Sequence, residues 1–281
     1  MRQLIFVVYL FPFLLQAQTI SDSFTNDSIK VEIVKIELKD GSTLIGQVIS
    51  EDENTIVFKT TSGIKMDIPR VEIKKQAVVT DKIKKGEIWE NDPNQTRLFF
   101  SPTGRPLDKG EGYFAVYELF FPFLAVGITD NLTLAGGMSL FLGADEQLLY
   151  IAPKYTFLKK EKVNLSAGIL FMKIPDVDQG AGIVYGVGTF GDRDKAVTVG
   201  LGYGFSGGDF ANSPVITLGG ELRAGKNTKF ISENWIFTSG TAPLFSLGLR
   251  FFGEKLAADF GLMAPPEADV MIPWLGFAYN F

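Results

Sequence analysis

Two glycine-rich motifs have residue types and spacings that support chemistry in other proteins. Gly204–Gly208 matches G-x-S-x-G, in which a serine nucleophile occupies a strand-to-helix elbow beside a base, usually histidine. Gly186–Gly191 matches G-x-G-x-x-G, which binds a dinucleotide only where a helix begins directly after it. Neither motif precedes a helical pattern, and the chain contains no histidine. We interpret both as glycine-rich strands and predict no catalytic residue and no cofactor.

The residue types that hold metals are also scarce. Asp176 and Asp178 suggest calcium, but an EF-hand needs another ligand before its glycine and a glutamate after it. The 281 residues include no cysteine, and the formal net charge is only −5. These features predict no metal site, and the mild negative charge argues against a nucleic-acid partner.

The first residues have the pattern of a secretory signal peptide over 1–17. Arg2 supplies a positive start, Leu4–Leu15 an apolar core, and Ala17 a small residue before cleavage. The polar residues 18–30 are expected to be a flexible mature N-terminus. This pattern predicts export from the cytoplasm.

Residues 31–76 alternate between apolar and polar types in short runs separated by turn signals such as Asp40-Gly41. Leu38–Val48 together with Ile68–Arg70 resembles small SH3-like or Sm-like β-barrels. Because lysines and acids are interleaved here, we predict a periplasmic module that binds a protein or the cell wall. Residues 77–111 are expected to be a linker, with Leu98–Phe100 packing under the next domain.

Residues 112–281 divide into segments of roughly ten residues, the length that a tilted strand needs to cross a membrane. We predict about twelve antiparallel strands, with ten as an alternative count, because the first two could form one bent strand. The predicted strands are Gly112–Phe121, Phe123–Thr129, Leu132–Leu142, Leu148–Leu158, Val163–Ile174, Gly182–Gly191, Ala196–Ser206, Pro214–Gly225, Phe230–Gly240, Leu244–Gly253, Ala257–Ala264 and Pro273–Phe281.

The connections between these strands alternate in kind. Short charged turns such as Lys159–Lys162 alternate with longer stretches rich in Gly, Pro and Ala, such as Pro175–Ala181. Outer-membrane barrels have short periplasmic turns and longer outer loops. An even strand count then places both ends of the barrel in the periplasm.

Alternation within each strand predicts one apolar face toward lipid and one polar face toward a lumen. Charged residues fall on the inward face, where opposite signs can pair. Glu233 and Asn234 are adjacent and claim opposite faces, so we expect a bulge or a membrane-edge position there. The predicted lumen-lining residues are Glu118, Lys154, Glu221, Arg223, Arg250 and Asp259.

The final strand places Leu275, Phe277, Tyr279 and Phe281 on one face. It resembles the last strand of bacterial outer-membrane β-barrels, which commonly ends in an aromatic residue read by the insertion machinery. The whole arrangement resembles two-part barrel proteins of the Bacteroidota. The resemblance implies outer-membrane lipid and the barrel-assembly machinery as partners, with Phe277, Tyr279 and Phe281 as the insertion signal.

The predicted fold is therefore an all-β transmembrane barrel over 112–281 with a small N-terminal β module. The predicted function is non-enzymatic, either a narrow porin-like channel or a structural anchor. A periplasmic binding module anchored by a closed barrel is an alternative, and so is a lipid-modifying enzyme, which the missing histidine disfavours. A soluble β-sandwich is the competing fold.

Overall fold

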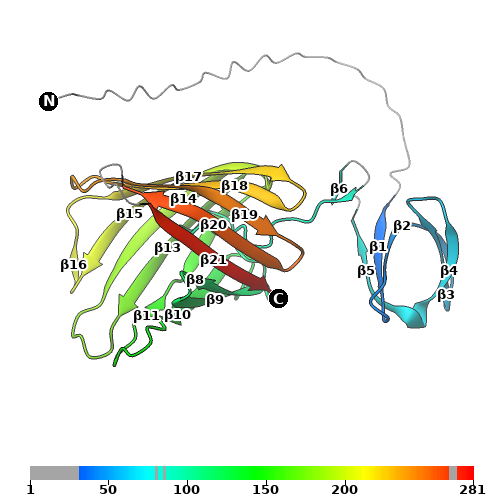
Figure 1. Ribbon diagram of the computed structural model, residues 1–281, viewed down its shortest axis with the longest axis horizontal. Helices are drawn as coiled ribbons and strands as arrows, with labels where there is room; N and C mark the ends of the chain where they lie inside the picture. The colour runs from blue at the N-terminus through cyan, green and yellow to red at the C-terminus, as the bar shows by residue number, and fades with distance from the viewer. Residues whose placement is uncertain (1–31, 80–81, 85–86, 266–270) are drawn as a thin grey trace, which may run out of the picture. The chain divides into compact units, whose positions relative to one another are not determined.

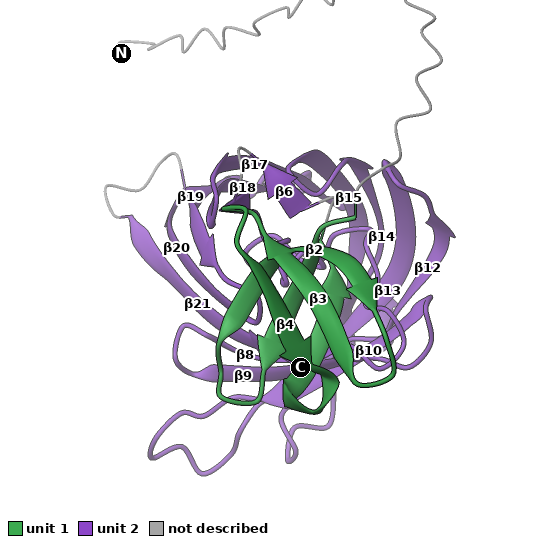
Figure 2. Cartoon of the chain, turned by 90° about the vertical axis from the view of Figure 1, so that its right-hand side faces the viewer, with its two compact units in different colours: residues 1–80 green, residues 81–281 purple. Residues whose placement is uncertain are grey.

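The computed structural model describes residues 32–79, 82–84, 87–265 and 271–281. The predicted signal peptide and flexible N-terminus lie outside the described residues. The chain divides into two compact units, residues 1–80 and 81–281, coloured green and purple in Figure 2. Within the described ranges, no helix is both long enough and apolar enough to cross a membrane.

Unit 1 is a five-stranded antiparallel sheet in the order β4-β3-β2-β1-β5. Alternating apolar residues place Val34, Ile36, Ile56, Phe58 and Ile68 in one buried cluster. A short 3-10 turn, Arg70–Glu72, leads into the last strand. The strands are β1 (Val34–Leu38), β2 (Thr43–Glu51), β3 (Thr55–Thr60), β4 (Lys65–Pro69) and β5 (Ile73–Val78). The resemblance to SH3-like barrels stays a prediction.

In its described part, unit 2 is a closed antiparallel barrel of 12 strands (Figure 1). The short strands β11 and β12 count as one, because both lie between β10 and β13. Neighbouring strands pair around the ring, and β9 pairs with β10 to close it. The wall strands are β8 (Gly112–Tyr117), β9 (Phe121–Gly127), β10 (Leu132–Met138), β11 (Leu149–Ile151), β12 (Lys154–Lys159), β13 (Val163–Lys173), β14 (Ala181–Gly191), β15 (Lys195–Ser206), β17 (Val215–Gly225), β18 (Thr228–Phe237), β19 (Leu244–Phe252), β20 (Leu256–Ala264) and β21 (Ile272–Asn280). Two-residue strands are β6 (Ile83–Lys84), β7 (Glu87–Ile88) and β16 (Asp209–Phe210).

The predicted barrel is confirmed, with two local differences. The first two strands are separate, as predicted, and Glu118 and Leu119 adopt positive φ values of 49° and 64° in the tight turn between them. The predicted strand Leu148–Leu158 is split into β11 and β12 at Pro153, which has no N–H for the ladder. Of the two expectations at Glu233, the bulge is wrong, since β17 and β18 stay in register from Val215 to Arg223.

The outer wall is apolar, and the polar residues face inward. In β15, Val197 is 54% and Leu201 is 50% exposed, whereas Thr198 between them is 2% exposed. Lys154, Glu221, Arg250 and other charged side chains are buried inside. This distribution is the reverse of that in a soluble protein and fits a wall that faces lipid. The single closed ring also replaces the two sheets that a β-sandwich requires.

Candidate functional site: the barrel interior

Both ends of the barrel lie on one rim. The N–H of Gly112 donates to the Phe281 carbonyl at 3.2 Å, and the Phe281 N–H donates to Gly112 at 2.9 Å. The short connections 128–131, 160–162, 192–194, 226–227 and 253–255 lie on this same rim, which we call the short-turn rim. The remaining connections form the opposite rim, as the alternation of the strands requires.

Residues 91–107, here called the interior segment, lie inside the barrel. Leu98, Phe99 and Leu107 are almost completely buried and belong to a cluster that also contains Ile231 of β18 and Trp274 of β21. The structure thus differs from the predicted linker 77–111, of which only a part connects the units. The linker interpretation rested on irregular sequence pattern, and this segment needs no regular pattern because the wall supplies its partners.

The wall and the interior segment fit each other closely at two glycines. A Cβ at Gly219 of β17 would lie 2.0 Å from Leu98 Cδ1. In the interior segment, a Cβ at Gly104 would lie 2.1 Å from the Asn164 carbonyl oxygen. Gly104 is also tied to the wall by Ser166 Oγ, which donates to its carbonyl at 2.8 Å, and by Thr189 Oγ1, which accepts its N–H at 2.9 Å.

Arg250 of β19 is the centre of a buried ion-pair network. Its Nε and Nη2 donate to the two carboxylate oxygens of Asp259 at 2.6 and 2.9 Å. Its Nη1 donates to Asp92 Oδ2 at 3.1 Å and to the Asn94 carbonyl at 2.7 Å. Asp259 also pairs with Arg97 at 3.3 Å. The Arg250 guanidinium thus binds a carboxylate of the wall, a carboxylate of the interior segment and main-chain carbonyls of that segment.

A second ion-pair group lies on β17 and β18. Arg105 of the interior segment pairs with Glu221 at 2.6 Å. Lys229 lies between Asp92 at 3.1 Å and Glu221 at 3.6 Å, and all three side chains are at most 1% exposed. Lys229 therefore links this group to the Arg250 network. The predicted strands Pro214–Gly225 and Phe230–Gly240 leave Lys229 in the turn between them, whereas the structure places it in β18, where the period of inward residues points it into the lumen.

Glu233 of β18 receives three main-chain N–H groups. Its Oε2 accepts from Phe99 at 2.9 Å, Phe100 at 2.9 Å and Ser101 at 3.0 Å. Its Oε1 accepts from the Trp235 indole at 2.8 Å. These donors explain why Glu233 can point inward without a bulge, because consecutive N–H groups form an anion-binding nest. Its neighbour Asn234 turns outward and donates to the Leu218 carbonyl at 3.0 Å.

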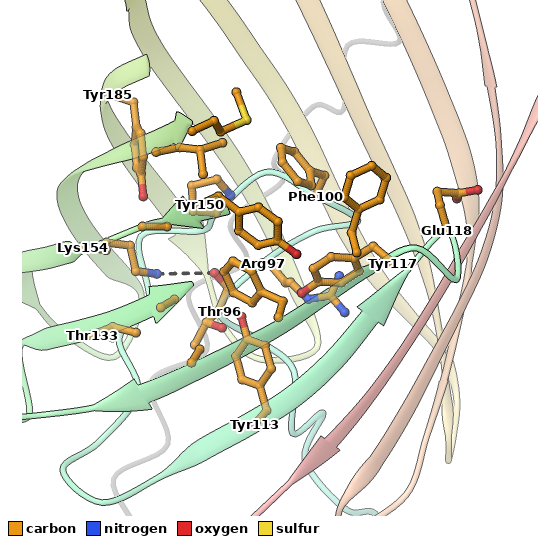
Figure 3. Close-up of a pocket in the computed structure, with 18 of the residues that line it drawn as sticks. Thr96, Arg97, Phe100, Tyr113, Tyr117, Glu118, Thr133, Tyr150, Lys154 and Tyr185 are labelled. Atoms are coloured by element: carbon orange, nitrogen blue, oxygen red, sulfur yellow. Dashed lines mark hydrogen bonds between the residues drawn. The ribbon is translucent and has the colours of Figure 1, made fainter. Parts of the chain in front are cut away.

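Glu233 accepts N–H groups of the interior segment, whereas the ammonium of Lys154 on β12 donates to carbonyl oxygens of the same segment. The distances are 2.9 Å to Thr103, 2.7 Å to Arg105 and 3.4 Å to Thr96, the last drawn as a dashed line in Figure 3. The wall therefore holds the segment through both its donors and its acceptors.

Arg223 lies at the short-turn rim, where its guanidinium pairs with Asp194 at 3.1 Å and lies 4.9 Å from the centroid of a Trp89 ring. Lys84 also pairs with Asp194. Partial burial by itself raises the pKa of Asp194, but the hydrogen bonds from Lys84 and Arg223 outweigh it and hold that pKa below its ordinary value. Residues 82–84 and 87–90 are thus fastened to this rim.

The remaining predicted site residues lie at the opposite rim and on the outer wall. Glu118 lies in the turn after β8 on the opposite rim, and its Oε1 accepts the Leu275 N–H at 2.7 Å. Phe277, Tyr279 and Phe281 are 44%, 47% and 54% exposed on the outer wall side of the last strand. Their role as an insertion signal stays a prediction.

A cavity of about 390 Å³ lies between the interior segment and the opposite rim. Figure 3 shows tyrosines from several wall strands around it, with Thr96, Arg97 and Phe100 supplied by the interior segment. A second, polar recess of about 650 Å³ lies at the short-turn rim, lined by Lys84, Arg193 and other charged residues. The interior segment separates the two spaces.

The glycine-rich motifs make ordinary strand structure. Gly186–Gly191 lies within β14, and Ser206 ends β15 at a hairpin in which it pairs with Asp209. Within the described ranges, no group of three or more His, Cys, Asp or Glu side chains is placed to hold a metal ion.

Sequence reasoning missed the charged residues of the interior segment, Asp92, Arg97 and Arg105. They occur in a stretch with no periodic pattern, so nothing local indicated burial. The predicted inward-facing wall charges, three acidic and three basic, balance among themselves, so they did not indicate these partners either.

No protein-family model and no curated protein matches this chain. Among solved structures, a KdgM porin in complex with disordered oligogalacturonate matches at 9% identity over 61% of this chain and 98% of its own, with a TM-score of 0.47. A NanC porin matches at 8% identity over 60% and 97%, with a TM-score of 0.41. A loop-deletion mutant of OmpT, an outer membrane protein of Vibrio cholerae, matches at 12% identity over 89% and 97%, with a TM-score of 0.34.

These similarities concern barrel architecture alone. The closed ring of 12 strands, the apolar outer wall and the shared rim of both barrel ends give the chain the fold of outer-membrane β-barrels. Its lumen differs from an open aqueous channel, because the buried interior segment lies within the ring and is bonded to the wall.

Proposed function

We propose that the protein is a closed, non-enzymatic outer-membrane barrel that anchors unit 1 on the periplasmic side. The observation that carries this proposal is the interior segment, which is bonded to wall strands around the ring. Charged or hydroxyl side chains from β10, β12, β13, β14, β17, β18, β19 and β20 contact it.

The bonding pattern explains why the barrel would stay closed at rest. Asp92, Arg97 and Arg105 are buried ions, and each has a counter-ion on the wall. Withdrawing the segment would separate each of these three ions from its wall counter-ion, while on the wall Arg250 would keep only Asp259 and Glu221 only Lys229. Removing one partner of a buried pair commonly costs about 3–5 kcal/mol, so spontaneous opening would be rare.

Orientation and partners follow from the rim that carries both barrel ends. Short turns lie on the periplasmic side in barrels of this class, which supports a periplasmic position for unit 1. There it would bind a protein or the cell wall, while the apolar wall contacts outer-membrane lipid. Phe277, Tyr279 and Phe281 would be read by the barrel-assembly machinery, and the two-part arrangement fits proteins of the Bacteroidota.

A narrow gated channel is the second candidate, and the two recesses favour it. A cavity on one side of the interior segment and a polar recess on the other would join if the segment moved. The difference between the candidates is whether that movement occurs without an added perturbation.

Conductance measurements across planar bilayers distinguish the closed barrel from the gated channel. The refolded chain from residue 18 should show no steps, while a heat-modifiable band on a gel confirms that the barrel is folded. The variant Arg250→Met, which weakens the hold on the interior segment, should produce intermittent steps. Reproducible steps from the unmodified folded chain would overturn the closed-barrel proposal and favour the channel.

A further inference from the structure

The cavity on the far side of the interior segment has a lining that the anchor function does not require. Its walls include Tyr113, Tyr117, Phe123, Tyr150, Leu170 and Trp274, and its floor is formed by Arg97 and Lys154 (Figure 3). Its volume of about 390 Å³ falls in the range of small-molecule sites, which are mostly apolar with a few polar groups. We call it the aromatic cavity.

The rings that line the aromatic cavity are ordered against one another. Tyr117 stacks on Trp274 at 6.0 Å, and Phe123 stacks on Tyr113 at 6.2 Å and on Tyr150 at 6.0 Å. These contacts hold the rings as a continuous wall. A flat apolar guest would meet ring faces and edges that are already positioned, so little ordering would accompany binding.

The two cations at the floor are already occupied. Lys154 donates to the carbonyl oxygens of Thr103 and Arg105, and Arg97 pairs with Asp259. The Arg97 guanidinium also lies 4.3 Å from the centroid of the Tyr117 ring. A carboxylate guest would have to displace these contacts and lose its own hydration, so the cavity disfavours anions.

Two buried donors of the lining remain available. The Tyr117 hydroxyl and the Trp274 indole N–H make no hydrogen bond within the described part of the chain. The Tyr150 hydroxyl, by contrast, donates to the Pro122 carbonyl. A buried donor without an acceptor is unfavourable, and a ligand oxygen near Tyr117 would relieve that cost.

We propose that the aromatic cavity is a binding site for a small, neutral, aromatic or alicyclic molecule that carries one hydrogen-bond acceptor. The ring wall supplies the contact area, the occupied cations exclude acids, and the Tyr117 hydroxyl supplies the polar contact. The site is separate from the anchoring role, because the contacts of the interior segment with β17, β18, β19 and β20 remain unchanged when a guest enters.

The test uses three matched probes: 2-acetylnaphthalene, which is neutral with an acceptor, naphthalene, which has none, and 2-naphthoate, an anion of similar shape. Binding to the full chain in lipid nanodiscs is measured by titration calorimetry, and empty nanodiscs correct for partition into lipid. Saturable binding of the ketone at one site per chain is expected. The naphthoate should bind at least about 10-fold more weakly.

Two neighbouring residues of β10 give a matched pair of variants. Ala135 lines the cavity and is 8% exposed, whereas Leu134 points to the outer face and is 49% exposed. Ala135→Phe fills the cavity and should abolish ketone binding. Leu134→Phe adds a ring outside the barrel and should leave binding unchanged.

Tyr117→Phe keeps the ring and removes only the hydroxyl, so it tests the polar contact even where Ala135→Phe prevents folding. It should weaken the ketone by about 2- to 10-fold and leave naphthalene unchanged. Three results would overturn the proposal: no saturable ketone binding, equal binding by the folded Ala135→Phe variant, or tighter binding of the naphthoate than of the ketone.

Discussion

Replacing Arg250 by methionine should loosen the interior segment while the barrel stays folded. Methionine keeps much of the apolar volume and removes every ionic contact of the guanidinium. The change leaves Asp92 with Lys229 and Asp259 with Arg97, so each carboxylate keeps one counter-ion. The carbonyls of Asn94 and Arg97 lose their donor as well, and the Leu98 carbonyl keeps only the 3.4 Å contact with Arg97 Nη1.

The free-energy cost of Arg250→Met depends on the ion pairs that remain after the substitution. Breaking a buried ion pair by removing one partner costs about 3–5 kcal/mol, and the surviving counter-ions place this case near the lower value. A loss of about 3 kcal/mol raises the population of the opened segment by about 100-fold. The population of the opened segment, reported by the labelling rate of a buried thiol, is therefore the quantity to measure.

The absence of cysteine makes a clean assay possible, since one introduced thiol is unique in the chain. Ser101 is 1% exposed and its hydroxyl has no partner within the described residues, so Ser101→Cys sacrifices no hydrogen bond of that group. The thiol should react with a maleimide only when the interior segment opens. Labelling in the Arg250→Met background should be about 100-fold faster than in the Ser101→Cys background alone.

A matched arginine provides the control. Arg193 lies exposed in the turn between β14 and β15, and Arg193→Met should change the labelling rate by less than about threefold. A heat-modifiable band must show that each variant is folded. If Arg250→Met labels at the parental rate, the ion-pair network does not hold the segment and the closed-barrel reasoning is refuted.

Three further predictions concern other parts of unit 2. Glu233→Gln removes the charge that accepts three main-chain N–H groups, and a cost of about 1.5–3 kcal/mol should speed labelling of the Ser101→Cys thiol by about 10- to 100-fold; an unchanged rate would show that the charge is dispensable. The lowered pKa of Asp194 means that its ion pair with Lys84 stabilises the attachment of Lys84 to the rim above the unfolded pKa of about 4, and that this stabilisation is lost as the pH falls toward the folded value. Hydrogen exchange at residues 82–84 and 87–90, corrected for intrinsic rates, should therefore rise below about pH 4. Asp194→Asn should show the same rise at pH 7. Leu201→Arg on the outer wall should destabilise the barrel by about 2–4 kcal/mol in refolding titrations into lipid vesicles, whereas a wall facing water would tolerate it.

Strand positions and facing could be read from the sequence because a barrel wall imposes period two on every strand. Val197, Val199 and Leu201 faced outward as their alternation predicted, and Lys154, Glu221 and Arg250 faced inward. The apolar outer face and the turn residues are local properties of the chain. They determine the wall without reference to any distant residue.

The contacts between the interior segment and the wall could not be predicted from the sequence in this way. Asp92 meets Arg250 across 158 positions of sequence, and Phe99 meets Glu233 across 134. No local pattern records such a pairing, because an irregular segment can satisfy its main chain either in water or on buried side chains. The same limit produced the wrong bulge at Glu233, whose partners lie in the interior segment.

The sequence by itself determined that this chain forms a membrane-facing β-barrel with both barrel ends on one rim. Those properties depend on residue period, strand number and turn length, which are written along the chain. Only the tertiary structure decided that residues 91–107 lie inside the barrel and that aromatic rings line a cavity beside them. Both depend on which distant side chains meet inside the closed ring, where burial makes each charge require a partner.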